Sequence, residues 1–291
     1  MKLLVTGRHG QVARALAPYG AAFIARPELD LADTARLSDA IARALEREQP
    51  DVLVSAAAWT DVDGAESEPD LAHAVNAVAP GILAVAAAAH GVPVIHLSTD
   101  YVFDGQLGSP YRPDDPVSPL GAYGRSKAAG EEAVREASPV HAILRTAWLH
   151  SPHGANFVRT MLRFGKERDE VAVVADAFGN PTAAADVAAG IVRVAAVLVT
   201  GPHREPHSET HHLVSRGAAS WADLAEHVLR GTRTRVRRIA AADYPTRAPR
   251  PRDTRLDGTS FEKRYGLVMP DWRAGVDRTL AALNRGSDYT V

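Results

Sequence analysis

The sequence predicts an α/β protein with a doubly wound parallel sheet and a smaller C-terminal lobe. Short aliphatic runs alternate with longer helical stretches over the first 148 residues, a pattern typical of a parallel sheet. The predicted strands are apolar on both faces, as in sheets covered by helices on both sides. A glycine-containing turn also links the first strand to the first helix, at residues 7–10. Together these features predict a Rossmann-type fold.

The predicted strands of the first half are short runs of β-branched or aliphatic residues. They span residues 3–5, 22–24, 51–55, 94–97 and 142–144. The helices between them span residues 11–18, 34–48, 69–89 and 122–136. Asp33 is a predicted N-cap, and Pro69 suits the first turn of its helix. His90-Gly91 is a predicted helix end.

After about residue 148 the alternation becomes less regular. We predict helices over residues 157–164, 183–198 and 221–230, a strand over 171–174, a loop over 201–210, an extended segment over 245–251 and a last helix introduced by 270–272. Ser220 and Asp223 have the spacing of a capping box. The sequence thus predicts a dinucleotide-binding domain in residues 1–148, with returning helices from about 153–200. Residues 149–291 are predicted to be mainly a substrate-binding lobe.

The composition limits the class of protein. The chain has 291 residues, of which 46% are apolar, enough for a substantial core. A net charge of −2 argues against nucleic-acid and membrane partners. The sequence has no cysteine, which excludes a thiolate metal site and a cysteine nucleophile. We find no signal peptide and no apolar run of membrane-spanning length, and therefore expect a soluble cytoplasmic protein.

The turn around Gly7 and Gly10 is the first candidate binding site. Glycines let the backbone approach a pyrophosphate, and a helix N-terminus offers free amides and the positive end of a dipole. The Gly-x-x-Gly spacing is a weak signal by itself, and a plain strand-to-helix turn is the alternative.

The end of the second strand indicates which cofactor is used. NAD-binding proteins often place an acid there, against the adenosine ribose. This chain has Ala25 and then Arg26, and a guanidinium suits a 2′-phosphate. The sequence therefore favours NADPH, with NADH as a possible second cofactor; an ordinary surface arginine is the alternative. Asp30 and Leu31 follow, where they would meet the adenine.

Tyr123 and Lys127 are the decisive pair. A spacing of four puts the phenol and the ammonium on one helix face. A free phenol, with a pKa near ~10, is a poor acid–base catalyst at neutral pH, and a nearby ammonium lowers that pKa. Of the 33 Lys and Arg residues only Lys2, Lys127, Lys166 and Lys263 are lysine, so a lysine at this position is unusual. Thr99 ends the fourth strand, at the edge where ligands bind, and can donate to a carbonyl oxygen.

These residues resemble the short-chain dehydrogenase/reductase superfamily, in its extended branch. Within that branch the chain is similar to the dTDP-4-dehydrorhamnose reductase family, essentially end to end. The similar segments are residues 56–63, 66–68, 75–81, 98–105, 145–148, 156–161, 179–182 and 270–273. The resemblance implies that NADPH reduces the 4-keto group of dTDP-4-dehydro-β-L-rhamnose, a dTDP-4-keto-6-deoxyhexose, to give dTDP-L-rhamnose.

The resemblance also implies roles for individual residues. The catalytic residues would be Thr99, Tyr123 and Lys127. The cofactor would be bound by Gly7, Gly10, Gln11, Val12, Arg26, Asp30, Leu31, Ala57, Ala58, Thr60, Tyr123 and Lys127. The substrate would be bound by Thr99, Asp100, Tyr123, Trp148 and Asn156. Asn76 would support the active-site helix.

The sequence departs from the family pattern at several positions. Ala13 replaces the usual glycine, Ala25 the usual acid, and residues 147–150 read Ala-Trp-Leu-His where Ser-Trp-Val-Tyr is usual. Some members bind magnesium between subunits through acids on the first helix, but residues 13–17 contain none, so we expect no metal. A homodimer is one possible oligomeric state.

Two other functions and two other clusters stay open. The chain resembles 4-ketoreductases of other dTDP-deoxysugars equally well. The non-catalytic regulatory subunit of methionine adenosyltransferase shares the fold and the motif of residues 99–105, although Thr99, Tyr123 and Lys127 are all present here. The histidines at 203, 207, 211 and 212 are expected in a solvated loop rather than at a metal. The arginines at 247, 250 and 252 would either clamp a diphosphate or form a solvated basic turn.

Overall fold

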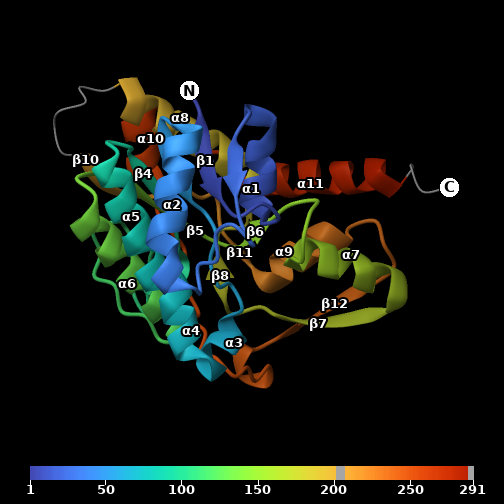
Figure 1. Ribbon diagram of the computed structural model, residues 1–291. Helices are drawn as coiled ribbons and strands as arrows, with labels where there is room; N and C mark the ends of the chain where they lie inside the picture. The colour runs from blue at the N-terminus through green and yellow to red at the C-terminus, as the bar shows by residue number, and fades with distance from the viewer. Residues whose placement is uncertain (201–206, 288–291) are drawn as a thin grey trace.

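The computed structural model describes residues 1–200 and 207–287, and its centre is a six-stranded sheet (Figure 1). The strand order is β10-β5-β4-β3-β1-β2, and every neighbouring pair is parallel. The strands are β1 Leu3–Thr6, β2 Ala22–Ile24, β3 Val52–Ser55, β4 Val94–Thr99, β5 Val140–Thr146 and β10 His207–His212. The predicted doubly wound α/β fold is confirmed.

The topology defines where a ligand would bind. After β2 the chain returns to the other side of β1 to form β3, so the winding direction reverses at β1 and β3. In open α/β sheets the crevice outside the carboxyl ends of the strands, at such a reversal, binds ligands. The Gly7 turn after β1, residues 56–60 after β3 and Asp100 after β4 all lie at this edge.

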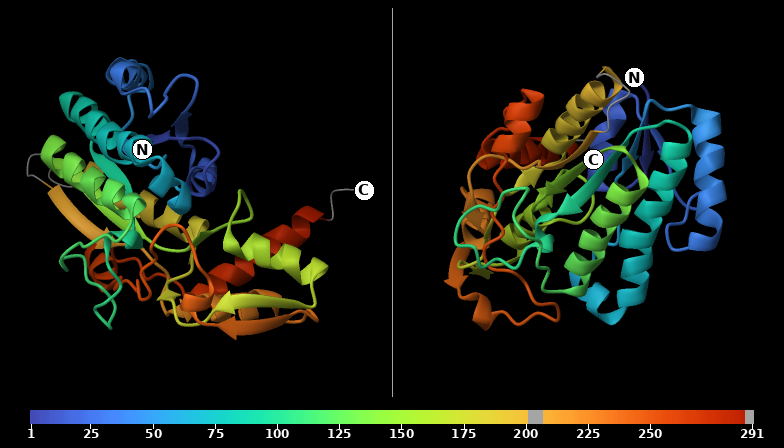
Figure 2. Two further views of the ribbon diagram at one scale, coloured as in Figure 1. Left: turned by 90° about the horizontal axis from the view of Figure 1, so that it is seen from below. Right: turned by 90° about the vertical axis from the view of Figure 1, so that its left-hand side faces the viewer.

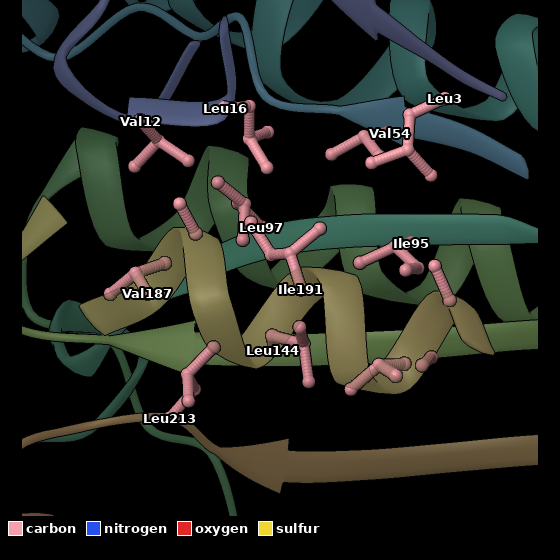
Figure 3. Close-up of a cluster of buried hydrophobic side chains, with 14 of the residues drawn as sticks. Leu3, Val12, Leu16, Val54, Ile95, Leu97, Leu144, Val187, Ile191 and Leu213 are labelled. Atoms are coloured by element: carbon pink, nitrogen blue, oxygen red, sulfur yellow. The ribbon is translucent and has the colours of Figure 1, made fainter. Parts of the chain in front are cut away.

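Helices cover both faces of the sheet (Figure 2). On one face α2 Thr34–Glu48, α5 Ala79–Ala89 and α6 Ala122–Ala137 lie side by side, as the right-hand view shows. The other face carries α1 Gln11–Leu16, α8 Ala184–Thr200 and α10 Thr259–Tyr265. The hydrophobic core between the sheet and this second layer of helices includes Leu97, Leu144 and Ile191, shown in Figure 3. The two apolar faces of the strands are thus both buried, as the sequence predicts.

The helix over residues 69–89 is continuous but changes its winding. It consists of α4 Pro69–His73, a π-helical turn Ala74–Val78, and α5. In the part of the chain that the structure describes, this helix alone is long enough and apolar enough to cross a membrane, with a mean hydropathy of 1.7. Our expectation that no apolar run reaches that length is therefore wrong. Half of that apolar stretch is buried, and the helix packs against α2 and α6. Its alanine-rich sequence explains both properties, since small apolar residues allow close packing over the sheet.

The second half of the chain forms a lobe with its own core (Figure 2, left view). Its elements are α7 Phe157–Glu167, β7 Glu170–Val174, α9 Trp221–Leu229, β12 Arg235–Ile239 and α11 Trp272–Ser287. Short paired strands connect it to the sheet, namely β6 Leu149–His150 with β9 Thr182–Ala183, and β8 Phe178–Gly179 with β11 Ala219–Ser220. The predicted capping box of α9 is present, because the Asp223 amide donates to the Ser220 hydroxyl and the Ser220 amide donates to the Asp223 carboxylate.

Several elements differ from the prediction. Residues 207–210 belong to β10 instead of a loop, while residues 201–206 lie outside the described residues. The α3 helix Val62–Ser67, α10 and β12 were not predicted. β12 carries three arginines, which pair with Glu170, Asp223 and Glu226 on its neighbours. A strand whose side chains form exposed ion pairs of this kind has no alternating apolar pattern to reveal it.

Candidate active site

The start of α6 packs directly on the turn that follows β4. A Cβ atom added to Gly124 would lie 2.2 Å from the carbonyl oxygen of Tyr101, so only glycine permits this contact. The rings of Tyr101 and Tyr123 consequently meet edge to face, with centroids 5.7 Å apart. This contact holds Tyr123 next to the end of β4, where Thr99 lies.

Thr99 and Tyr123 belong to a buried polar chain. The Thr99 hydroxyl donates to Asp100 Oδ1 at 3.0 Å and accepts from the Tyr101 amide at 3.2 Å. The Thr254 hydroxyl donates to the other carboxylate oxygen of Asp100 at 2.6 Å. Burial raises the pKa of Asp100 to about 6, against hydrogen bonds from Thr254 and Thr99 that lower it. Sequence reasoning missed Thr254, which is distant in the chain and belongs to no motif.

Lys127 lies on the same face of α6 and is buried, with a relative exposure of 3%. Its ammonium donates to the carbonyl oxygen of Leu97 at 2.7 Å and lies 3.4 Å from Nε2 of His96. Burial lowers the pKa of Lys127 to about 8, opposed by the negative charge of Glu131. The sequence thus brings Tyr123, Thr99 and Lys127 to one edge of the sheet, as predicted.

The predicted effect of Lys127 on the phenol is wrong in this structure. Burial raises the pKa of Tyr123 above its ordinary value, the negative charge of Asp100 raises it further, and a hydrogen bond with Thr99 opposes the rise. The ammonium of Lys127 is directed instead at Leu97 and His96. A phenol in these surroundings stays protonated at neutral pH and is therefore a proton donor rather than a base.

Asn76 supports α6 from the π-helical turn. Its amide nitrogen donates to the Ser126 hydroxyl on α6 at 3.0 Å and to the Trp59 carbonyl at 3.0 Å, and its oxygen accepts from the Trp59 amide at 2.8 Å. A Cβ atom on Gly130 would lie 2.0 Å from the Asn76 carbonyl oxygen, which shows how closely the two helices approach. Asn76 therefore links α6 to the loop after β3, as the resemblance implies.

The glycine turn after β1 has the backbone that a phosphate site needs. Gly7 has φ +84°, and a Cβ atom on it would lie 3.2 Å from that of Ala57. The Thr6 hydroxyl accepts from the amides of Ala56 and Ala57, at 3.0 and 3.1 Å, and so joins the ends of β1 and β3. Gly10 caps α1 without a side-chain hydrogen bond and has open space where a Cβ would be. An anionic group can therefore approach the first amides of α1.

The other predicted cofactor residues lie in different environments. Val12 and Leu31 are buried in the two hydrophobic cores, so any contact with a cofactor would come from their backbones. Arg26 is exposed just after β2, and Thr60 is exposed after β3, whereas Ala58 is partly buried. Asp30 accepts the amide of Ala32 at 3.0 Å and so shapes its own turn.

Gln11 joins the glycine turn to the second lobe. Its side-chain oxygen accepts from Asn156 Nδ2 at 3.0 Å and from the Ser151 hydroxyl at 2.9 Å. The side-chain oxygen of Asn156 accepts a hydrogen bond from the Arg159 amide and so caps α7. The predicted cofactor residue Gln11 and the predicted substrate residue Asn156 are thus in direct contact.

Trp148 follows β5 in a left-handed backbone conformation, with φ 46°. One face of its indole stacks on Trp221 of α9, with ring centroids 3.6 Å apart and planes 9° apart. A Cβ atom on Gly179 would lie 2.5 Å from the same indole. Trp221, which sequence reasoning missed, therefore holds Trp148 between the sheet and the second lobe.

The remaining clusters are structural contacts. His212 is buried, and His211 contacts Ser260 and Glu209, so the expected solvated loop is wrong for these two residues. No group of three His, Asp or Glu side chains within residues 1–200 and 207–287 is placed to hold a metal. Arg250 bonds to Asp63 at 2.8 Å, so this part of the basic turn is docked on α3.

A cavity of about 550 Å³ lies apart from these residues. It is bounded by the segments 214–218 and 255–259, with Pro110, Arg112, Asn180 and Glu262. Arg216 and Glu262 in its wall pair with each other. The cavity shares no residue with the predicted catalytic or cofactor sites.

Known proteins resemble the chain along its whole length. The model of the family described as RmlD substrate binding domain matches residues 1–285. The dTDP-4-dehydrorhamnose reductase of Sinorhizobium fredii is 42% identical over 294 residues, covering 97% of this chain and 98% of that protein. The protein of the same name from Escherichia coli K12 is 39% identical, again covering 97% and 98%.

A solved structure is similarly close. The dTDP-4-dehydrorhamnose reductase of Bacillus anthracis, solved in complex with NADP, superposes with a TM-score of 0.88 at 30% identity. The superposition covers 97% of this chain and 99% of that one. The chain therefore belongs to the RmlD substrate binding domain family, that of the dTDP-4-dehydrorhamnose reductases.

Proposed function

We propose that the protein reduces the 4-keto group of dTDP-4-dehydro-β-L-rhamnose with NADPH and so produces dTDP-L-rhamnose. The observation that carries this proposal is the placement of Thr99, Tyr123 and Lys127 together at the carboxyl edge of β4, in a chain 42% identical to a reductase of that name. The test is the fall in NADPH absorbance when the purified protein meets dTDP-4-dehydrorhamnose, with identification of the sugar product. Unchanged absorbance with a folded protein would refute the proposal.

The glycine turn and its neighbours fit the cofactor. Gly7 and Gly10 leave room for a diphosphate at the start of α1, where Gln11 and Val12 offer backbone amides. The cofactor would then pass Ala57, Ala58 and Thr60 after β3 on its way to Tyr123 and Lys127. NADPH, when bound, supplies the hydride that reduces the sugar at C4.

The chain's own residues then manage the proton. The carbonyl oxygen of the substrate gains negative charge during reduction and needs a proton from an acid within hydrogen-bond reach. Tyr123 is protonated at neutral pH, since burial raises its pKa, and is placed to donate. Thr99 contacts the same phenol, and its single hydroxyl proton is donated to Asp100 here, so the hydroxyl would have to turn away from Asp100 to donate to the carbonyl oxygen beside Tyr123. The Lys127 ammonium, although its known donors face Leu97 and His96, would contribute its positive charge to stabilising the phenolate that remains.

The charge balance supports a soluble cytoplasmic enzyme whose partner is a dTDP-sugar. A net charge of −2 provides no overall attraction to nucleic acid or to anionic lipid. The apolar helix 69–89 is packed over the sheet, between α2 and α6. Trp148 and Asn156, at the entrance of the second lobe, with Asp100 behind Thr99, would contact the sugar nucleotide.

Replacing Arg26 by aspartate should shift the preference from NADPH toward NADH. The guanidinium is exposed just after β2, where it would meet the 2′-phosphate, and a carboxylate there would repel that phosphate. The measurement is kcat/KM for both cofactors in the wild type and in Arg26→Asp. Arg43→Asp, at an exposed arginine within α2, is the control for the change in charge. Equal use of both cofactors by the wild type would contradict the assignment of Arg26.

Replacing Trp148 by alanine should raise KM for the sugar nucleotide much more than KM for NADPH. Its indole is held by the stack on Trp221 and is only partly buried, so its accessible part would cover the hexose ring. A stacking contact of this kind is worth about 0.5–1.5 kcal/mol, which corresponds to roughly a 2- to 12-fold change. Trp148→Phe should keep part of the effect. An unchanged KM for the sugar nucleotide would place Trp148 in the structural core instead.

A further inference from the structure

Behind the catalytic lysine lies a row of buried polar side chains that the proposed mechanism does not use. His96 of β4 is 1% exposed, and Ser55 of β3 beside it is 2% exposed. His96 Nδ1 lies 3.1 Å from the Ser55 hydroxyl oxygen, and its Nε2 lies 3.4 Å from the Lys127 ammonium. The row runs from the middle of the sheet to the active-site helix.

The chemistry of the three groups determines which of them donates. Burial lowers the pKa of His96 well below its ordinary value, and the positive charge of Lys127 acts in the same direction, so the ring is neutral. A neutral imidazole has one donor and one acceptor nitrogen, whereas an ammonium can only donate. Nε2 must therefore accept from Lys127, and Nδ1–H must donate to the Ser55 hydroxyl.

This arrangement directs the ammonium. Lys127 has three N–H donors, of which one goes to the Leu97 carbonyl at 2.7 Å and one points to His96. Only the third is left for the active site. The direction of that donor is consequently set by groups on β4 and not by the active site itself.

Other charges also face this pair. The carboxylate of Glu131, one turn along α6, acts on Lys127. His141 of β5 and Arg135 of α6 act on His96. His96 is nevertheless the one side chain among these whose acceptor lies within hydrogen-bond distance of the ammonium, within the described residues.

We propose that His96, with its tautomer set by Ser55, is a positioning residue that fixes the orientation of the Lys127 ammonium behind the active site and helps to keep it charged. The inference rests on the proposed reductase function, in which Lys127 must be charged. Removing the acceptor should lower the pKa of Lys127, because the charged form loses a hydrogen bond that the neutral form needs less.

The pKa of Lys127 can be measured without any catalysis. The chain has four lysines, so protein labelled with ¹³C at lysine Cε should give four signals, and the signal absent from Lys127→Met assigns Lys127. We expect this pKa to fall by about 1 in His96→Phe, which fills the space without an acceptor, since a hydrogen bond to a charged group is worth about that much. His96→Gln, whose side-chain oxygen can replace Nε2, should restore most of the wild-type pKa.

His141→Phe is the matched control, because it removes a buried histidine on the neighbouring strand that bonds to Ser138 and Ser208 instead. It should leave the pKa of Lys127 within about 0.3 of the wild type, because the contact it removes is not with the ammonium. If His96→Phe folds poorly, Ser55→Ala tests the same row, since loss of its hydroxyl leaves Nδ1–H without this acceptor and weakens the hold on the tautomer that accepts from Lys127. That variant should lower the pKa of Lys127 in the same direction.

The dependence of kcat on pH is a second test of the role of His96. A charged lysine is present below its pKa, so wild-type kcat should fall as pH rises through about 8. His96→Phe should lose activity about one pH unit earlier, and be about fivefold slower than wild type at pH 8 but nearly equal at pH 6. Restoration by His96→Gln supports the proposal. An unchanged pKa in His96→Phe, or equal losses in the Phe and Gln variants, overturns it.

The two proposals can fail separately. A wild-type protein that does not reduce dTDP-4-dehydrorhamnose would refute the proposed function, while the lysine titration would still decide the role of His96. Conversely, normal reductase activity with a Lys127 pKa indifferent to His96 would refute only the positioning role.

Discussion

Replacing Tyr123 by phenylalanine is expected to lower kcat by about 10²–10⁴-fold, the usual contribution of general acid catalysis. The phenol is the group held against Thr99 at the end of β4, and burial keeps it protonated at neutral pH. The phenylalanine ring can keep the edge-to-face contact with Tyr101, so the start of α6 should be undisturbed. The dissociation constant for NADPH should therefore change little, and the loss should appear in kcat.

Tyr101→Phe is the matched control for this experiment. It removes the phenol hydroxyl of the neighbouring ring, whose centroid lies 5.7 Å from that of Tyr123. That hydroxyl interacts with Arg250 rather than with Thr99. We expect a loss of less than about tenfold there, the size of one hydrogen bond outside the reacting centre. A Tyr123→Phe protein with normal circular dichroism and most of its kcat would show that another group or water supplies the proton.

The alkaline limit of activity is expected to come from Lys127 rather than from Tyr123. The pKa of the phenol is raised, so it does not ionise near neutral pH, whereas the pKa of Lys127 is lowered to about 8. The sequence motif alone suggests the opposite assignment, in which the ammonium lowers the pKa of the phenol. The structure reverses it because burial raises the pKa of the phenol, while the ammonium faces the Leu97 carbonyl and His96.

The fold was largely predictable because its sheet is apolar on both faces. Five of the six parallel strands can be recognised in the sequence as short aliphatic runs. Asp33 caps α2, as its position indicates, because its side chain accepts a hydrogen bond from the Arg36 amide. The sixth strand, β10, reads His-Ser-Glu-Thr-His-His and lies at the sheet's edge. Its pairing with β5 provides hydrogen bonds for the backbone of β10. Its polar side chains form hydrogen bonds of their own, such as the one between His211 and Glu209.

The site was predictable only where its residues share a local pattern. Tyr123 and Lys127 lie one helical turn apart, and the spacing alone places them on one face of α6. Thr254, which anchors Asp100 across 154 positions of sequence, has no such pattern. His96 is hidden for another reason, since a histidine within a buried strand reads as an ordinary interruption of the apolar run. Long-range polar contacts of this kind become visible only when the chain has folded.

Removing one partner of the buried ion pair behind the active site should strongly destabilise the fold. Glu131 of α6 is 1% exposed and accepts from Arg145 at 2.8 and 2.7 Å and from the Ser98 hydroxyl at 2.6 Å. Arg145 is itself buried, with its guanidinium 5.0 Å from the centre of the Phe103 ring. Removing one partner of such a pair leaves an uncompensated buried charge, which typically costs 3–5 kcal/mol.

Glu131→Leu should therefore lower the free energy of unfolding in urea by about 3–5 kcal/mol, although the side chain touches no substrate. Glu132→Leu is the matched control, because Glu132 is the next residue on α6, is 62% exposed and pairs with Arg135, as Glu131 also does. It should change the free energy of unfolding by no more than about 0.5 kcal/mol. The double variant Glu131→Leu, Arg145→Met should recover much of the loss, since no buried charge is left unpaired.

The pH dependence of this effect has a defined sign. Burial by itself would raise the pKa of Glu131, but the ion pair and hydrogen bond with Arg145 outweigh it, so the pKa lies below its ordinary value. A carboxyl group whose pKa is lowered by folding stabilises the native state above its unfolded-state pKa and loses that contribution as pH falls through the folded-state pKa. The difference in unfolding free energy between wild type and Glu131→Leu should thus be largest at neutral pH and shrink in acid. A constant difference down to strongly acidic pH would mean that Glu131 stabilises the fold by packing and not by its charge.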